Sequence, residues 1–140
     1  MLKNTRAIRI EWGDCDPAGI VYYPRYSAMF DASTTALFER AIGMNKIDFT
    51  KHYGIVGYPM VSTSTKFIIP SRYGDEVSIE TMVREIRRSS FDVVHQLFRG
   101  DKVAVEASET RVWSGLDPND PTKIKSVKIP DEVVNRLKGV

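Results

Sequence analysis

Residues 24–43 read PRYSAMFDASTTALFERAIG, and this stretch predicts one long helix from Pro24 to Ile42. Proline suits the first turn of a helix, because its missing N–H would have no intrahelical partner there. Gly43 is a natural stop for the helix. Apolar side chains recur along one stripe at steps of three and four, and these are Tyr26, Met29, Phe30, Leu37 and Ala41.

A second face of this helix consists of small residues. Ala28, Ala32 and Ala36 recur at every fourth position, and we expect this face to lie close to a sheet. At about 1.5 Å per residue the helix is about 28 Å long, which makes it the longest element that the sequence predicts.

The sequence around the helix alternates between apolar and polar residues, as half-buried strands do. The alternation predicts strands at 7–12, 61–69, 77–86, 90–99 and 103–113. Gly100-Asp101 separates the last two and is typical of a hairpin turn. A turn-rich loop at 117–122 precedes a short final strand and a terminal helix that begins near Pro130. This order predicts an α+β fold with one long central helix packed against a curved antiparallel sheet.

Length and composition fit a single domain covering residues 1–140, with 42% hydrophobic and 27% charged residues. The 20 basic and 18 acidic residues are too evenly balanced to indicate a nucleic-acid binder. No apolar run approaches the roughly 20 residues that span a bilayer, and the first residues lack the apolar core of a secretory signal. We therefore expect a cytoplasmic protein that binds neither nucleic acid nor membrane.

Several kinds of chemistry are disfavoured by what the sequence lacks. It has one cysteine, Cys15, and therefore neither an internal disulfide nor a cysteine-based zinc site. It contains no GxSxG elbow, P-loop or GxGxxG fingerprint. The two histidines stand far apart; we interpret His95 as a structural strand residue and His52 as a surface residue in a loop. We expect no metal site.

The distinctive run is GDCDPAGIVYYPRY at 13–26, which places two acids in a turn just before the long helix. The free N–H groups at a helix start can hold a developing oxyanion, while a nearby carboxylate serves as nucleophile or base. From the residues alone, Asp14 and Asp16 could equally be turn and cap residues. Cys15 is interpreted as structural, because the flanking carboxylates disfavour its thiolate.

This run resembles the signature of the 4-hydroxybenzoyl-CoA thioesterases, a family with the hot-dog fold. The resemblance extends over nearly the whole chain, through YGIVGYPMV at 53–61, YGDEVSIET at 73–81 and REIRRSSF at 84–91. It implies hydrolysis of an aromatic (4-hydroxybenzoyl- or benzoyl-like) or short-chain acyl-CoA to free acid and CoA. It implies no cofactor, because coenzyme A is part of the substrate. It also implies a homo-oligomer, a dimer or tetramer, and we expect the sheet face away from the helix to be apolar and covered by that assembly.

The resemblance also assigns roles to individual residues. Asp16 matches the catalytic carboxylate, acting as nucleophile or general base, and the backbone N–H of Tyr23 matches the group that polarises the thioester carbonyl. Gly19 would let the backbone approach the substrate closely. Asp31 matches an acid of the family and is expected near the acyl pocket. The remaining substrate contacts match Tyr58, Pro59 and Met60 in one loop and Arg87, Arg88 and Ser89 between two strands.

Substrate-facing positions depart from the 4-hydroxybenzoyl enzyme. Ser89 replaces a basic residue, Tyr58 replaces a threonine, and Lys46 stands where that enzyme has tryptophan. The arginine pair suits coenzyme A phosphates, and charge alone suggests adding three lysines to it, Lys123, Lys125 and Lys128. Thioester hydrolysis is therefore predicted more firmly than the acyl group.

Three alternatives stay open. The first is a short-chain acyl-CoA thioesterase of the type associated with the Tol-Pal system, whose motif has a histidine near the position of Tyr26. The second, a hot-dog dehydratase, would need a histidine-containing site. The third is an acyl-CoA-binding protein without turnover, which would have no use for an unpaired carboxylate at Asp16.

Overall fold

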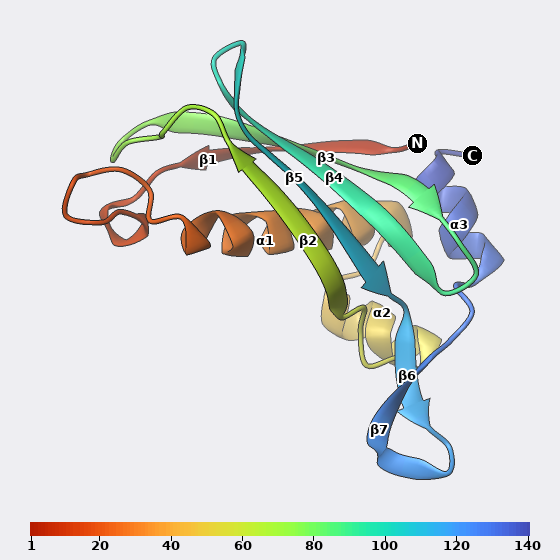
Figure 1. Cartoon of the computed structure of the whole chain (residues 1–140). Coiled ribbons are helices and arrows are strands. Elements are labelled where there is room, and N and C mark those ends of the chain that lie inside the picture. The colour runs from red at the N-terminus through yellow and green to blue at the C-terminus, as the bar shows by residue number, and fades with distance from the viewer.

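The structure is a computed structural model that describes all residues from 1 to 140. A five-stranded antiparallel sheet lies across the long helix α1, Pro24–Ile42 (Figure 1). The strands follow the spatial order β1-β3-β4-β5-β2. Their bounds are β1 Lys3–Arg9, β2 Met60–Phe67, β3 Glu76–Ile86, β4 Ser90–Arg99 and β5 Lys102–Val112. The predicted α+β class, with one long helix against an antiparallel sheet, is confirmed.

Smaller elements complete the chain. A 3-10 turn, η1, spans Trp12–Asp14; the helix α2 is Lys46–Tyr53; the strands β6 Ser114–Asp117 and β7 Asp120–Ser126 form a separate hairpin; and α3 is Asp131–Lys138. The hairpin projects away from the five-stranded sheet (Figure 1).

Most predicted boundaries agree with the structure to within two residues. The helix ends as predicted, at Gly43, whose φ of 80° places it in the left-handed region that glycine adopts freely. The first strand was predicted too late: it ends at Arg9, and Trp12 lies in η1. The helix α2 was missed. The loop predicted at 117–122 covers the end of β6, the turn of the hairpin and the first residues of β7, and the short strand predicted after it is the rest of β7.

The prediction for the small face of α1 was wrong. Ala28 and Ala32 are exposed and Ala36 is only half-buried, so this face points away from the sheet. The predicted apolar stripe is buried instead, together with Ser33, Thr34, Phe38 and Ile42. Burying large apolar side chains removes more apolar area from water than burying alanines, and this sets the rotation of the helix on the sheet.

The core consists of two apolar clusters at the two ends of α1. Tyr26, Met29 and Phe30 belong to one cluster of 11 buried residues, whereas Leu37 and Phe38 belong to another of 14. Between these two groups on the helix stand Ser33 and Thr34, which are both buried and polar. A polar layer therefore crosses the middle of the core.

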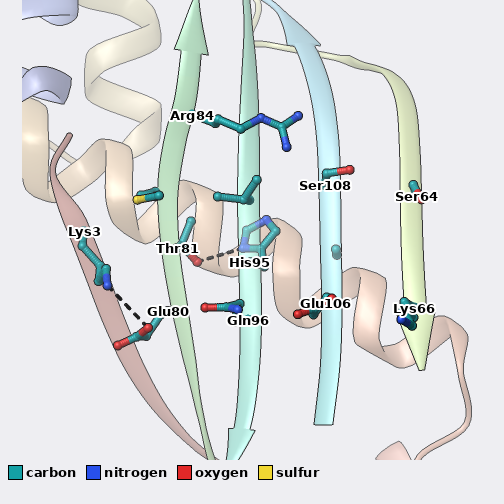
Figure 2. A pocket seen from close by; sticks show the side chains of 13 residues that line it. Lys3, Ser64, Lys66, Glu80, Thr81, Arg84, His95, Gln96, Glu106 and Ser108 are labelled. Carbon is teal, nitrogen blue, oxygen red and sulfur yellow. Dashed lines mark hydrogen bonds and ion pairs between the residues drawn. The ribbon is translucent and has the colours of Figure 1, made fainter. Parts of the chain in front are cut away.

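The sheet face turned away from α1 is not apolar, contrary to expectation. Figure 2 shows the side chains of Lys3, Glu80, Gln96, Glu106 and Lys66 on this face, with α1 behind the sheet. One-sided burial of an antiparallel sheet produces this alternation of apolar and polar positions along each strand. An apolar outer face therefore cannot be the reason for any assembly.

Candidate active site

The loop before α1 is a tight turn closed by its own backbone. The N–H of Asp16 donates to the carbonyl of Ile20 at 2.9 Å, and the N–H of Gly19 donates back to the carbonyl of Asp16 at 2.9 Å. Gly19 has a φ of 78°, a conformation that costs a residue with a Cβ. The turn itself therefore requires glycine at this position, in addition to the predicted close approach of the backbone to the substrate.

A second segment of backbone holds this turn in place. The N–H of Val21 donates to the carbonyl of Ser71 at 2.9 Å, and the N–H of Tyr73 donates to the carbonyl of Gly19 at 3.0 Å. The Tyr73 ring meets the Trp12 ring edge-on, with centroids 5.6 Å apart. The loop is therefore fixed by contacts on both sides before the helix begins.

The two acids of the loop have different surroundings. Asp14 is fully engaged: one oxygen accepts from the N–H of Glu11 at 3.0 Å, and the other pairs with Arg25 at 3.2 Å. Asp16 accepts one bond, from the N–H of Ala18 to Oδ1 at 2.9 Å, and its Oδ2 has no partner within the chain. Asp14 therefore serves as the cap and turn residue, and Asp16 keeps an oxygen free for chemistry.

The start of α1 offers one free backbone donor. Tyr23 is the N-cap residue and Pro24, which has no N–H, follows it. The N–H of Tyr22 donates to the carbonyl of Asp14 at 2.8 Å, whereas the N–H of Tyr23 makes no hydrogen bond within the chain. A free N–H at a helix start is the group that can stabilise a negatively charged oxygen.

Cys15 sits between the two acids. Burial, followed by the negative charges of Asp14, Asp16 and Asp75, raises the pKa of its thiol. A raised pKa leaves little thiolate at neutral pH, which agrees with the structural role predicted for Cys15.

Asp31 lies about two turns into α1, where its carboxylate is 56% exposed. Its Oδ1 accepts from Nη2 of Arg111 at 2.8 Å, and its Oδ2 has no partner within the chain. Another nitrogen of the same guanidinium, Nη1, donates to the carbonyl of Tyr58 at 3.3 Å. The structure thus links two predicted substrate contacts, Asp31 and the loop at 58–60, through a residue that the sequence reasoning missed.

The three residues predicted in one loop differ in what they can offer a ligand, and Met60 is the first residue of β2. Pro59 and Met60 are exposed, but the Tyr58 side chain is 2% exposed and packs in the core against Phe38. Burial raises the pKa of the Tyr58 hydroxyl to about 12. The aromatic ring of Tyr58 thus lies in the core. The Lys46 ammonium makes a cation–π contact with it, 4.4 Å from the centre of the ring.

Another residue that the sequence analysis missed, Glu109, extends the polar layer of the core. Glu109 accepts from the Thr34 hydroxyl at 2.6 Å and from Nε of Arg111 at 3.0 Å, and His95 Nε2 stands 3.3 Å from it. Burial alone would raise the pKa of Glu109, but bonds from His95, Arg111 and Thr34 outweigh it and lower the pKa to about 2. Glu109 and Arg111 occupy inward positions of β5 in step with Ala107, and this alternation was the signal available in the sequence.

The two histidines are not placed as catalytic groups. His95 is 1% exposed, and its Nδ1 lies 2.8 Å from the Thr81 hydroxyl, so its predicted structural role is confirmed. His52 is exposed as predicted, but it lies in α2 rather than in a loop.

The two adjacent arginines, Arg87 and Arg88, have different surroundings. Arg87 forms a two-pronged pair with Asp92 at 2.7 and 3.1 Å, which holds the pKa of Asp92 at about 2. Arg88 is exposed and has no acidic partner within 4.0 Å. The carbonyl of Ser89 accepts from the N–H of Trp113 at 2.7 Å, which fixes the turn that carries the pair.

None of the predicted site residues lines either of the two best-formed hollows. One of them, of about 440 Å³, lies on the outer sheet face shown in Figure 2 and contains neither Asp16 nor Asp31. Its lining mixes both signs of charge without any free backbone donor at a helix start, so we place the site at Asp16 on chemical grounds. No group of three or more His, Cys, Asp or Glu side chains is arranged to hold a metal ion. None of the helices has the length and apolar character needed to cross a bilayer.

Comparison with known proteins identifies the class. The family model of the thioesterase-like superfamily matches residues 10–137. The 4-hydroxybenzoyl-CoA thioesterase of Pseudomonas sp. (strain CBS-3) is 35% identical over 131 residues, covering 90% of this chain and 91% of its own. The 1,4-dihydroxy-2-naphthoyl-CoA hydrolase of Gloeothece citriformis (strain PCC 7424) is 27% identical over 138 residues, covering 98% and 92%.

Solved structures agree with this assignment. A crystal structure of an aspartate-to-asparagine mutant of 4-hydroxybenzoyl-CoA thioesterase, complexed with 4-hydroxybenzoyl-CoA, superposes with a TM-score of 0.87 at 33% identity. The match covers 96% of this chain and 98% of that one. The chain belongs to the thioesterase-like superfamily. It is a thioester hydrolase with the hot-dog fold and resembles the 4-hydroxybenzoyl-CoA thioesterases most clearly among the relatives described.

Proposed function

We propose that this enzyme hydrolyses an aromatic, ring-hydroxylated acyl-CoA, of which 4-hydroxybenzoyl-CoA is the leading example, to the free acid and coenzyme A. The observation that carries the proposal is the free oxygen of Asp16 in the same short loop as the unpartnered N–H of Tyr23. No metal or redox cofactor takes part in this scheme, which needs only a carboxylate and a hydrogen-bond donor.

In this proposal the thioester carbonyl oxygen accepts from the Tyr23 N–H, and the positive end of the α1 dipole adds to the stabilisation. Asp16 then attacks the carbonyl carbon or takes the proton from an attacking water. Either route expels the coenzyme A thiolate and ends with water adding its oxygen to the acyl group. Asp14, which is fully engaged, holds the loop and takes no part in the bond changes.

Asp31 supports the choice of a hydroxylated ring. It follows Tyr23 by eight positions on α1, a rise of about 12 Å. A benzoyl group with a para hydroxyl, together with a hydrogen bond of about 3 Å at each end, covers a similar length. The free Oδ2 of Asp31 could accept from that hydroxyl, whereas a butyryl chain is too short and has no donor.

We assign binding of the coenzyme A moiety to the basic residues that the family resemblance implies. Arg88 is the free member of the arginine pair and the stronger candidate for a phosphate contact. Lys125 has no acidic partner, whereas Lys123 and Lys128 face Asp120 and Asp131. Pro59 and Met60 are exposed and, with the backbone of Tyr58 and Ser89, complete the proposed contacts.

The proposal includes assembly into a homo-oligomer, in which a second copy encloses the acyl group. The strand β2 pairs only with β5, so its other edge is open, and Val61 and Phe67 on it are 62% and 53% exposed. The Phe67 ring lies 6.4 Å from the Tyr23 ring, which brings this open edge next to the start of α1. An open strand edge with exposed apolar side chains near its two ends, beside the site, is where a second chain would bind. We treat residues 1–140 as one domain working in the cytoplasm, a reducing compartment that suits the free Cys15.

Thiol release from a panel of acyl-CoA thioesters tests the proposal. We expect 4-hydroxybenzoyl-CoA to react fastest, benzoyl-CoA more slowly, and butyryl-CoA and hexanoyl-CoA, the substrates of the Tol-Pal-associated alternative, slowest. Asp16→Asn should lower kcat by about 10²- to 10⁴-fold. Asp14→Asn is the matched control in the same loop and should lose less than about ten-fold. Full turnover in Asp16→Asn would refute the assignment of the carboxylate, and a preference for butyryl-CoA would refute the acyl group.

A further inference from the structure

Glu109 and Arg111 are the only buried side chains among the aspartates, glutamates, lysines and arginines of the chain. Placing two charges in a core is costly unless their geometry and hydrogen bonding are well matched. Neither residue belongs to the predicted site. Their function must therefore be sought in what they contact.

The guanidinium of Arg111 reaches three separate parts of the chain. Its Nε donates to Glu109 at 3.0 Å, its Nη2 to Asp31 of α1 at 2.8 Å, and its Nη1 to the carbonyl of Tyr58 at 3.3 Å. Because the guanidinium is planar, these three directions are fixed relative to one another. Arg111 therefore holds α1 and the segment before β2 at one spacing.

Glu109 fixes the orientation of the Arg111 guanidinium. The carboxylate also accepts from Thr34 at 2.6 Å and faces His95 at 3.3 Å, and His95 is held in turn by Thr81 at 2.8 Å. The side chains of Glu109 and Arg111 are 3% and 5% exposed, whereas Asp31 is 56% exposed. The chain of contacts therefore runs from a rigid interior outward to one exposed carboxylate.

We propose that Arg111, anchored by Glu109, is a positioning residue that aims Asp31 and sets the Tyr58–Met60 segment as one wall of the acyl site. This inference rests on the function proposed above. Arg111 does not touch the substrate; it acts through Asp31, whose Oδ2 it leaves free to accept from the acyl group. Selectivity for a hydroxylated acyl group then depends on a residue of β5 that lies behind the wall.

Arg111→Lys is the discriminating change, because lysine keeps the charge and loses the fork that reaches all three partners. The experiment measures kcat and KM for 4-hydroxybenzoyl-CoA and benzoyl-CoA in the wild type, Arg111→Lys, Asp31→Asn and the double variant. We expect each single change to lower the preference for the hydroxylated substrate about ten-fold, mainly through KM. The double variant should have the preference of Asp31→Asn alone.

A merely structural role would give a different pattern. Arg111→Lys would then slow both substrates alike, and its effect would add to that of Asp31→Asn; this result would overturn the inference. Arg84→Lys, on the outer sheet face, is the matched control and should leave the preference unchanged. If Arg111→Lys does not fold, Glu109→Gln tests the same linkage, with the same loss of preference expected and an unchanged preference counting against it.

The outcomes separate this inference from the proposed function. Absence of thiol release from any aromatic thioester by the wild type would refute the proposed function. Wild-type turnover without a preference for the hydroxyl, or with a preference that Arg111→Lys leaves intact, would refute only the role of Arg111.

Discussion

Replacing Glu109 with glutamine should destabilise the protein, and the loss should depend on pH. Glutamine keeps the shape of the side chain and removes the negative charge that Arg111 and His95 face. The folded protein lowers the pKa of Glu109 from its ordinary value of 4.5 to about 2. The ionised form is therefore stabilised by folding.

The size of the effect follows from these two values. At about 1.4 kcal/mol per pKa unit, lowering the pKa from 4.5 to about 2 corresponds to about 3 kcal/mol of unfolding free energy. Because the pKa of the folded state is the lower one, this stabilisation is complete above pH 4.5. It is lost as the pH falls through about 2, and roughly half of it remains near pH 3.

Urea unfolding at a fixed protein concentration, followed by circular dichroism, measures this loss. We expect Glu109→Gln to be less stable than the wild type by about 3 kcal/mol at pH 7 and by about half of that at pH 3. The matched control is Glu106→Gln, three positions earlier on β5, where the glutamate has no ion-pair partner within 4.0 Å. This control should change stability by less than about 0.5 kcal/mol.

Two results would refute the reasoning. A destabilisation of the same size at pH 7 and pH 3 would mean that lost packing or hydrogen bonding, and not the charge, is responsible. A Glu109→Gln protein as stable as the wild type at pH 7 would mean that burial of the carboxylate cancels the bonds it receives.

Three further changes test other parts of the site. Arg88→Ala should raise KM for acyl-CoA about ten-fold in steady-state assays. Arg87→Ala should mainly lower stability, because Arg87 is paired with Asp92. Equal effects of the two changes on KM would contradict the different roles given to the two arginines. Val61→Arg should reduce the sedimentation coefficient to that of a monomer, and a wild type that is already monomeric at micromolar concentration would contradict the role given to the β2 edge. Tyr58→Phe should leave kcat/KM within about two-fold of the wild type, since the ring is in the core. For the same reason, Tyr58→Ala should lower the free energy of unfolding in urea by about 4 kcal/mol. A large activity loss in Tyr58→Phe would show that the hydroxyl contacts the substrate.

Local sequence was sufficient to predict the long helix and the acidic turn that precedes it. The bounds of α1 could be predicted because Pro24, Gly43 and the apolar spacing between them are properties of neighbouring residues. The position of Asp16 in the turn just before α1 could be predicted for the same reason, since the two are close in the sequence. The helix α2 was missed because its eight residues bury only Phe49, which leaves no apolar stripe to detect.

Tertiary structure alone decided the roles of the charged residues. Asp14 and Asp16 look alike in the sequence, and only the folded loop shows that Arg25 and a backbone N–H use both oxygens of Asp14. Arg87 and Arg88 also look alike in the sequence. Only the folded structure shows that Asp92, on β4, pairs with Arg87.

The contacts of Arg111 show the same limit most clearly. Arg111 and Asp31 are 80 positions apart, and Thr34 and Glu109 are 75 apart. Their meeting depends on the register of β5 and on the rotation of α1 over the sheet, which the packing of both apolar clusters sets together. The sequence by itself determined the long helix, most of the strands and the acidic turn before α1, because those arise from short-range geometry. Which buried charges pair with each other, and which exposed carboxylate they contact, was decided by long-range packing.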